Sequence, residues 1–227
     1  MANPDLRRRL DALPGWLSYE EGETLYDLAR ACTGRGVIVE IGSWKGKSTT
    51  CLGLGSRAGH GVKVFAIDRH TDGTFPEWKG NVAAAGIEDL VTPVKGLSQQ
   101  VVHEFDEAIE LLFIDGAHTY DLVVEDWDGW VPKVVPGGVV AMHDTTGFPD
   151  VKRVAEERLY KSPDFRGVRF VYPTTSLGTK APASAFDRVR NRFALGVMRS
   201  VAGARAWKRL VPRPLVQAGR RILRAIQ

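Results

Sequence analysis

The stretch from Val37 to Thr50 constrains the fold of this chain more than any other part. It reads Val-Ile-Val-Glu-Ile-Gly-Ser-Trp-Lys-Gly-Lys-Ser-Thr-Thr. The β-branched run at its start is typical of a strand that is buried on both faces. Gly42 and Gly46 allow a sharp turn and a close approach to a ligand, and the hydroxyl residues that follow suit the start of a helix. This order predicts a ligand site at the carboxyl end of a parallel sheet.

Strand-like and helix-like segments alternate along the rest of the chain. Further strands are predicted at 62–68, 91–95, 109–115, 139–142, 168–172 and 175–180, and helices at 48–58, 77–85, 98–105, 119–130 and 151–160. Residues 1–35 also look helical, with capping-box spacing at Ser18-Tyr-Glu-Glu21, and Pro136-Gly-Gly138 reads as a turn. The alternation predicts an α/β fold with a Rossmann-like, doubly wound, mostly parallel sheet. The last two strands are expected to form an antiparallel hairpin at its edge.

Charge divides the chain into an acidic body and a basic end. From Asp187 onward there are eleven Lys or Arg and one acid, which leaves 20 basic and 26 acidic residues in 1–186. We therefore predict an N-terminal helical cap (1–35), a central domain (36–183) and a basic, amphipathic helical tail (184–227). Such a tail can pack on the acidic body, which we favour, lie on an anionic membrane or bind nucleic acid.

Composition favours a cytoplasmic protein with one full core. The chain has 227 residues, and no apolar run approaches the length of a membrane span. The first residues are polar and lack the apolar centre of a secretory leader. Cys32 and Cys51 do not form a CxxC pair, so we expect them to be reduced core residues.

The glycine turn does not match the common phosphate-binding motifs. A P-loop needs four residues between its first glycine and Gly-Lys-Ser/Thr, but only three separate Gly42 from Gly46. The dinucleotide pattern GxGxxG is also missing from the turn. Instead, Glu40 lies within the strand and Asp68 ends the next one, where an acid can bind ribose hydroxyls. A tight turn without a ligand remains an alternative for the motif by itself.

A second group of polar residues follows two later strands. Asp115 and His118 come after the strand at 109–115, and His143 and Asp144 come after the strand at 139–142. Because parallel strands end at one edge, these side chains should meet near the glycine turn. They could hold Mg²⁺, and a neutral histidine could act as a general base. Single Asp and His residues at strand ends often cap helices or serve the fold, and for His143 both explanations stay open.

Several short motifs together resemble one enzyme family. They are Glu40-x-Gly-x-x-x-Gly-x-Ser48, Phe113-Ile-Asp-Gly-x-His-x-Tyr120, Asp126, Trp130, Pro132, Pro136-Gly-Gly138 and His143-Asp144. Residues from about 36 to 145 thereby resemble the class I S-adenosylmethionine-dependent methyltransferases. The resemblance is to the group that includes cephalosporin-hydroxylase-like proteins and rhamnosyl or macrolide-sugar O-methyltransferases.

The resemblance implies a cofactor, a metal and roles for individual residues. S-adenosylmethionine would bind at Glu40, Gly42, Ser43, Gly46, Ser48, Asp68, Ser98 and Asp115. Family members bind Mg²⁺ through an acid after the fourth strand and an acidic pair after the fifth, which implies Asp115 and Asp144, with His143 in place of an acid. Related catechol-type enzymes carry their base three residues after the first metal acid, which implies His118. The expected catalytic residues are His118, Asp115 and His143.

The acceptor is expected to be the hydroxyl of a small molecule, with a sugar or oligosaccharide as first choice and a mannose- or rhamnose-containing glycan as the sharper expectation. Its specificity should depend on Trp16 and Tyr19, the loop 70–78 and the segment 145–149. Phe75, Trp78 and Phe148 could stack on a sugar face or cover the sulfonium, and they could equally be ordinary loop anchors. Two alternatives remain: a metal-independent methyltransferase, and a non-catalytic module that binds membranes or nucleic acid through its tail. No nucleic acid partner is expected, because Ile114-Asp-Gly-Ala replaces the Asn/Asp-Pro-Pro-Tyr type of motif. Membrane contact through 187–227 and a homo-oligomer both stay open.

Overall fold

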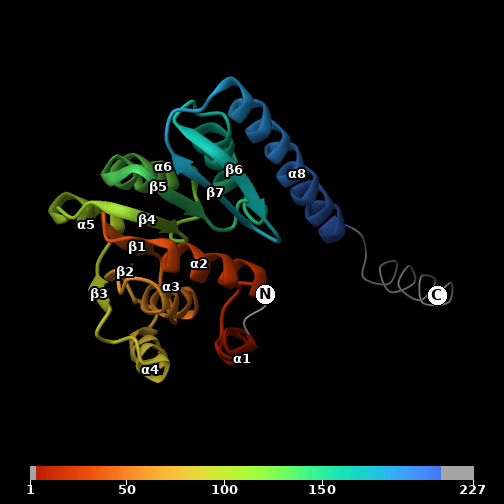
Figure 1. The fold of residues 1–227 in the computed structure, drawn as a ribbon. Helices are drawn as coiled ribbons and strands as arrows, with labels where there is room; N and C mark the ends of the chain where they lie inside the picture. The colour runs from red at the N-terminus through yellow and green to blue at the C-terminus, as the bar shows by residue number, and fades with distance from the viewer. Residues whose placement is uncertain (1–3, 211–227) are drawn as a thin grey trace.

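A seven-stranded sheet runs through the centre of the molecule. In the computed structural model, which describes residues 4–210, the strand order is β3-β2-β1-β4-β5-β7-β6 (Figure 1). The strands are β1 (Val37–Ile41), β2 (Val64–Asp68), β3 (Val91–Lys95), β4 (Ile109–Ile114), β5 (Val134–Met142), β6 (Phe165–Val171) and β7 (Thr175–Lys180). The first five strands are parallel, and β7 pairs antiparallel with both β5 and β6. The predicted Rossmann-like sheet with an antiparallel edge hairpin is therefore confirmed.

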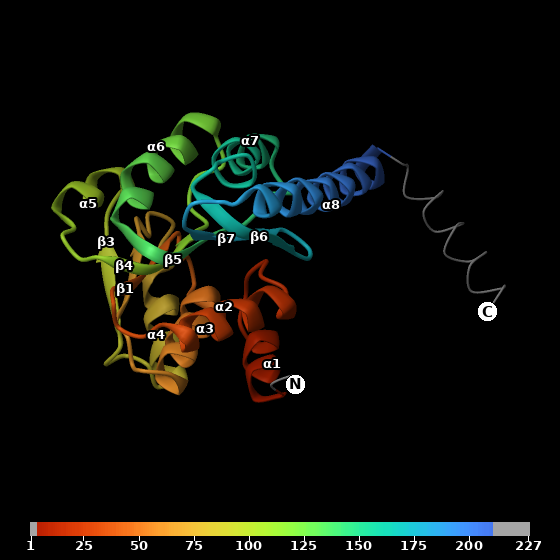
Figure 2. The ribbon, with the colours of Figure 1, turned by 45° about the horizontal axis from the view of Figure 1, so that its top comes forward.

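Helices cover both faces of this sheet (Figure 2). Helices α1 to α4 lie on one face and α5 to α8 on the other. They are α1 (Pro4–Ala12), α2 (Tyr19–Ala31), α3 (Lys47–Ala58), α4 (Phe75–Ala85), α5 (Ser98–Glu104), α6 (Tyr120–Trp130), α7 (Pro149–Val154) and α8 (Ala185–Leu210). Two short helical segments, η1 (Val131–Lys133) and η2 (Ala155–Tyr160), continue α6 and α7.

The two-residue period of the central strands builds the two cores. In β1, Ile38 packs into the cluster under α1 to α4, and Val39 packs into the cluster under α5 to α8. In the neighbouring β4, Leu111 and Leu112 divide in the same way. Alternate side chains of a strand point to opposite faces, so a continuous apolar run is what a strand buried on both sides requires.

Three local predictions differ from the structure. Residues 1–35 form two helices, because Pro14 and Gly15, with φ of +134° at Gly15, interrupt the run. The predicted turn at Pro136-Gly-Gly138 lies inside β5, where the pairing with β4 shifts register. The predicted helix at 151–160 changes from α7 to the π-helical η2 near its middle.

The first part of the basic tail is one long helix that packs on the body. Asn191, Leu195, Met198 and Ala202 are buried on the inner side of α8. The amide of Asn191 accepts a hydrogen bond from Val168 N–H (3.0 Å) and donates one to Phe165 O (2.8 Å), both in β6. This packing is the arrangement we favoured, while residues 211–227 of the predicted tail lie outside the described part. The division of the chain into a cap, a domain and a tail stays a prediction.

Two further expectations concern burial. Cys32 and Cys51 are both buried and free, as predicted. Among residues 4–210, no helix combines the length and the apolar character needed to cross a membrane.

Candidate active site

A cavity of about 590 Å³ opens at the carboxyl ends of β1, β2, β4 and β5. Most of the residues predicted for the site contribute to its wall. They are Gly42, Ser43, Ser48, Asp68, Ser98, Asp115, His118, His143 and Asp144. The edge of the sheet therefore brings together nearly all of the candidate residues. The two exceptions are Glu40 and Gly46, which do not line the cavity.

The glycine turn brings β1 against the end of β4. Gly42 has φ of +87°, and a Cβ atom there would collide with the carbonyl oxygen of Asp115. Gly46 has φ of +85°, and its Cβ would lie 3.1 Å from the indole of Trp78. Both positions therefore need glycine for the close packing of the turn. Gly46 packs against Trp78 of α4, and its contact with the cofactor stays a prediction.

Asp68 holds the backbone at the edge of the cavity. Its two carboxylate oxygens accept hydrogen bonds from Trp44 N–H (2.8 Å) and His70 N–H (2.7 Å). A carboxylate has about four acceptor positions, so each oxygen can still accept one more hydrogen bond. Two backbone hydrogen bonds thus fix the orientation of Asp68 in the cavity wall, and its binding of a ligand hydroxyl stays a prediction.

Glu40 lies beneath the site rather than in its wall. It is fully buried, and its Oε2 accepts a hydrogen bond from Thr49 Oγ1 (2.5 Å). Its Oε1 has no hydrogen-bond partner among the described residues. Burial raises the pKa of Glu40 to about 8, against the lowering effect of the Ser48 and Thr49 hydroxyls. Its role in cofactor binding stays a prediction.

Ser98 brings in an acid whose role the motifs did not reveal. The Ser98 hydroxyl donates to Asp126 Oδ1 (2.5 Å), and the amide of Gln99 donates to the same oxygen (2.8 Å). Burial raises the pKa of Asp126 to about 6. Asp126 in α6 thereby fixes the start of α5, which forms the cavity wall next to Asp68.

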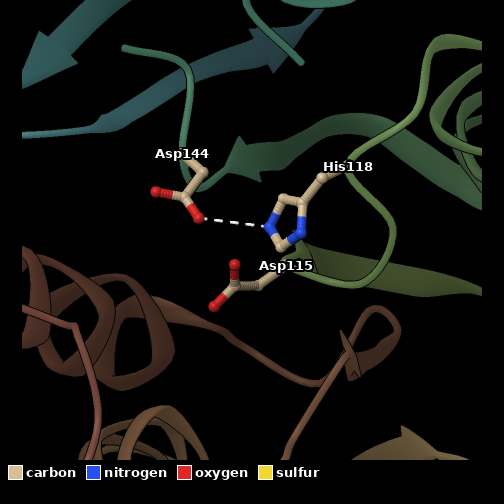
Figure 3. Close-up of side chains that lie close together, drawn as sticks. All are labelled: Asp115, His118 and Asp144. Carbon is tan, nitrogen blue, oxygen red and sulfur yellow. Dashed lines mark ion pairs between the residues drawn. The ribbon is translucent and has the colours of Figure 1, made fainter. Parts of the chain in front are cut away.

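Three polar side chains converge at the ends of β4 and β5 (Figure 3). Asp115, His118 and Asp144 each offer one ligand atom, and these atoms lie within 4.8 Å of one another. Nε2 of His118 lies 3.1 Å from Oδ2 of Asp144. The His118 ring stacks on Phe148 at 4.0 Å between centroids. Asp144 adopts a left-handed backbone (φ +60°), an unusual conformation that is frequent at functional sites.

His143 is positioned differently from the prediction. Its side chain is only 4% exposed, with Nδ1 3.0 Å from Asp115 Oδ1 and Nε2 3.7 Å from Glu21 Oε2. Burial disfavours its charged form, but the carboxylates of Asp115 and Glu21 outweigh burial and raise its pKa well above the usual value. Both ring nitrogens of His143 therefore face carboxylates. The side chains that lie close enough together to hold a metal ion are those of Asp115, His118 and Asp144, whereas the predicted set was Asp115, His143 and Asp144. The metal ligands stay a prediction.

Glu21 is the residue of the site that the sequence did not reveal. Its Oε1 accepts hydrogen bonds from Thr174 N–H (2.8 Å), Thr174 Oγ1 (2.7 Å) and Thr175 Oγ1 (2.9 Å). Burial opposes ionisation of Glu21, but His143, the Ser18 N–H and the Thr174 hydroxyl lower its pKa to about 2. The only signal in the sequence was the capping box, which predicted the helix start now seen at Ser18 and nothing more.

A match to known proteins covers this same region. Residues 39–145 match a family model described as a methyltransferase domain. The central part of the chain, just under half of its length, is thus similar to a methyltransferase domain. The segment runs from β1 to the turn after β5 and includes Asp68, Asp115, His118 and Asp144. The family resemblance inferred from the motifs is confirmed.

Several known proteins are similar to this chain in sequence or in fold. Over an alignment of 125 residues that covers 48% of this chain, the sequence is 32% identical to the uncharacterized protein y4gI of Sinorhizobium fredii (strain NBRC 101917 / NGR234), and the match spans 13% of the length of that protein. The fold is similar to that of the O-methyltransferase TomG from Streptomyces achromogenes, involved in tomaymycin synthesis and solved with SAM (TM-score 0.61, 20% identity, 79% of this chain and 90% of that one). It is also similar to an O-methyltransferase from Bacillus cereus solved with SAH (TM-score 0.60, 20% identity, 78% and 91%).

The residues of the methyltransferase domain fit the cofactor of this fold. The cavity volume of about 590 Å³ lies within the range of roughly 300–1,000 Å³ that is usual for ligand sites. The buried Ser43 hydroxyl lines the cavity and has no hydrogen-bond partner among residues 4–206. An unpartnered buried hydroxyl and an oriented Asp68 supply the polar contacts that a nucleoside with an amino acid chain requires.

Proposed function

We propose that the protein is an S-adenosylmethionine-dependent O-methyltransferase that acts on a hydroxyl group of a small molecule. The observation that supports this most is the position of the Asp115, His118 and Asp144 cluster. It opens into the same cavity as Gly42 and Asp68. A donor site and a group able to activate a hydroxyl thus share one space.

The donor half of the cavity would bind the cofactor, which when bound supplies a methyl group on a sulfonium. Asp68 would accept the ribose hydroxyls through its free acceptor positions. Ser43 would donate its unpartnered hydroxyl, and Ser98 would form part of the wall while Asp126 holds it in place. Gly42 would allow the chain to pass close to the ligand without a side chain.

The acceptor half would bind a divalent cation, with Mg²⁺ as the proposed ion. Asp115, Asp144 and His118 would hold it, and the bound ion would lower the pKa of an acceptor hydroxyl. Two carboxylates favour a hard cation, and water or acceptor oxygens would complete its coordination. An imidazole ligand also suits Mn²⁺ or Fe²⁺.

The alternative is a metal-independent methyltransferase in which His118 is the general base. The 3.1 Å approach of His118 Nε2 to Asp144 Oδ2 favours this version, because the carboxylate would orient the ring and stabilise its charged form. Removal of His118 separates the two versions. A His118→Ala change would weaken Mn²⁺ binding if His118 is a ligand, and would leave it unchanged if His118 is a base only.

A sugar or oligosaccharide is the proposed acceptor, with a mannose- or rhamnose-containing glycan as the sharper form. Trp16 supports it: this side chain is 81% exposed, lines the cavity, and lies 4.9 Å from the Trp44 ring. An exposed aromatic face at a cavity mouth suits the C–H face of a sugar. Phe148, stacked on His118, lies beside the reacting groups. In contrast, Trp78 is buried and stacks on Phe75, so those two residues serve the core.

Calorimetry with S-adenosylhomocysteine, with and without Mg²⁺, tests the proposal. We expect saturable binding of the wild-type protein and at least tenfold weaker binding of Asp68→Ala. The surface variant Asp89→Ala is the matched control.

Transfer of a labelled methyl group to simple glycosides, compared with phenols, then tests the acceptor class. Absence of heat at protein concentrations well above micromolar would refute the donor site. The cytoplasmic location, the homo-oligomer and the expectation of no nucleic acid partner stay predictions.

A further inference from the structure

Helix α8 has an exposed apolar face on the side opposite its packed face. Phe186, Val189, Phe193 and Val197 are 69%, 67%, 77% and 43% exposed. They recur every three or four residues, so they form one stripe along the helix. Figures 1 and 2 both show α8 along the outer side of the β6–β7 hairpin, with one flank that no other helix or strand of residues 4–210 covers.

Positive charge borders this stripe. Arg190 and Arg192 are exposed on either side of it, and the guanidinium of Arg190 lies 5.8 Å from the centre of the Phe186 ring. Within residues 4–206, these two arginines form no ion pair with an acidic side chain. The one acid of the first turn, Asp187, instead accepts hydrogen bonds from the hydroxyl and the N–H of Ser184.

We propose that this outer face of α8 binds the surface of an anionic lipid bilayer. The inference is independent of the proposed chemistry. A helix with a bulky apolar stripe and arginines at its borders can insert the stripe at the level of the lipid headgroups while the arginines contact lipid phosphates. The inner face of α8 remains packed on β6, so the helix can bind lipid without unfolding the body.

Two other occupants fit the face less well. In a symmetric pair of chains joined through α8, the unpaired arginines of both copies would approach one another at the border of the contact. A nucleic acid would satisfy the arginines, but its phosphates would leave Phe186 and Phe193 in water. A lipid surface provides both the negative charge and the apolar layer.

Vesicle flotation with the full-length protein tests the proposal. We expect binding to vesicles of phosphatidylcholine mixed with phosphatidylglycerol, and much weaker binding to phosphatidylcholine alone. The double variant Phe186→Ser/Phe193→Ser should bind at least roughly tenfold more weakly, whereas Phe186→Leu/Phe193→Leu should bind like wild type. Arg190→Gln/Arg192→Gln should weaken binding more than Arg8→Gln/Arg158→Gln, two exposed arginines on α1 and η2. Circular dichroism would verify that each variant is folded.

Three results would overturn the proposal. The first is binding to anionic vesicles that the serine variant does not reduce, since residues other than the stripe would then bind the lipid. The second is a wild-type dimer in light scattering that the serine variant converts to monomer without vesicle binding, which assigns the face to a second copy. The third is tight binding to duplex DNA with no binding to vesicles.

Discussion

Nδ1 of His143 lies 3.0 Å from Oδ1 of Asp115, so a buried imidazole supports one side of a carboxylate that faces the cavity. The other ring nitrogen faces Glu21 at 3.7 Å. A buried chain of acid, imidazolium and acid thus connects helix α2 to the end of β4. This row of three side chains orients Asp115, although Glu21 itself does not line the cavity.

Replacing Glu21 with Gln should destabilise the protein at neutral pH. The variant keeps the shape of the side chain but removes one of the two carboxylates that face the ring of His143. Loss of one partner of a buried ion pair typically costs about 3–5 kcal/mol. Urea unfolding at pH 7 measures this, and the exposed neighbour Glu20→Gln should change the free energy of unfolding by less than about 0.5 kcal/mol. Equal effects of the two variants would show that the pairing contributes little.

Replacing Asp144 with Asn should weaken metal binding. Asn lacks the charge of the carboxylate, and we expect the affinity for Mn²⁺ to fall by roughly 100-fold. Paramagnetic resonance of free Mn²⁺ measures this without a methyl acceptor. Asp121→Asn, an exposed acid in the first turn of α6, should leave the affinity unchanged. Wild-type protein that fails to bind Mn²⁺ would favour the metal-independent version.

Glu40 should make the wild-type protein less stable as the pH rises from 5 to 8. Its folded pKa of about 8 lies above the ordinary 4.5, so the folded state binds more protons than the unfolded state in this window. The resulting loss approaches about 1.4 kcal/mol per pH unit. In Glu40→Gln this contribution disappears, so the variant should gain stability relative to wild type between pH 5 and 8. Urea unfolding at both pH values measures the gain.

Glu110 provides the control for this experiment. It accepts hydrogen bonds from Thr33, Gly34 and Arg35 N–H, and its pKa is lowered because these donors and Arg35 outweigh burial. Its contribution is present above pH 4.5 and is lost only as the pH falls through the lower folded value. Glu110→Gln should therefore cost the same stability at pH 5 as at pH 8. A flat difference for Glu40→Gln as well would contradict the raised pKa.

Replacing Gly42 with Ala should cost more stability than replacing Gly86 with Ala. Both glycines have positive φ, at +87° and +68°, so both variants carry the backbone strain of about 1–2 kcal/mol. At Gly86 the new methyl group meets no atom within 4 Å, whereas at Gly42 it collides with the backbone of Asp115. Thermal unfolding compares the two variants, and only Gly42→Ala should also weaken S-adenosylhomocysteine binding. Equal losses would show that the turn adjusts easily.

The parts of the fold that are coded locally could be predicted from the sequence. The apolar run of β1, the glycine turn and the capping box at Ser18 each act over a few residues, and each was found at the expected place. The meeting of Asp115 with Asp144 also followed, because it depends only on the parallel order of β4 and β5. The extension of β5 through Pro136-Gly-Gly138 did not, because glycine and proline are typical of turns and of irregular strand pairing alike.

The different surroundings of His118 and His143 could not be predicted. Both histidines follow strands at the same edge, and their roles depend on what surrounds each ring. Glu21 lies 153 residues from Thr174 in the sequence, and no pattern indicates that its carboxylate would meet both β7 and His143. Long-range partners of this kind raise the pKa of His143 inside the protein, whereas His118 remains the more exposed ring.

The interruption between α1 and α2 has a consequence for the design of shorter or altered forms. We call the connecting residues 13–18 the hinge. Trp16 and Leu17 of the hinge contribute to the cavity wall, although they lie before residues 39–145. A fragment cut to those residues would lose that wall, the counter-charge of His143 and the final hairpin. Conversely, grafting a different hinge onto an intact chain should change which acceptors enter while the reacting groups stay in place. The hinge is therefore the segment to randomise in a search for new acceptor preferences.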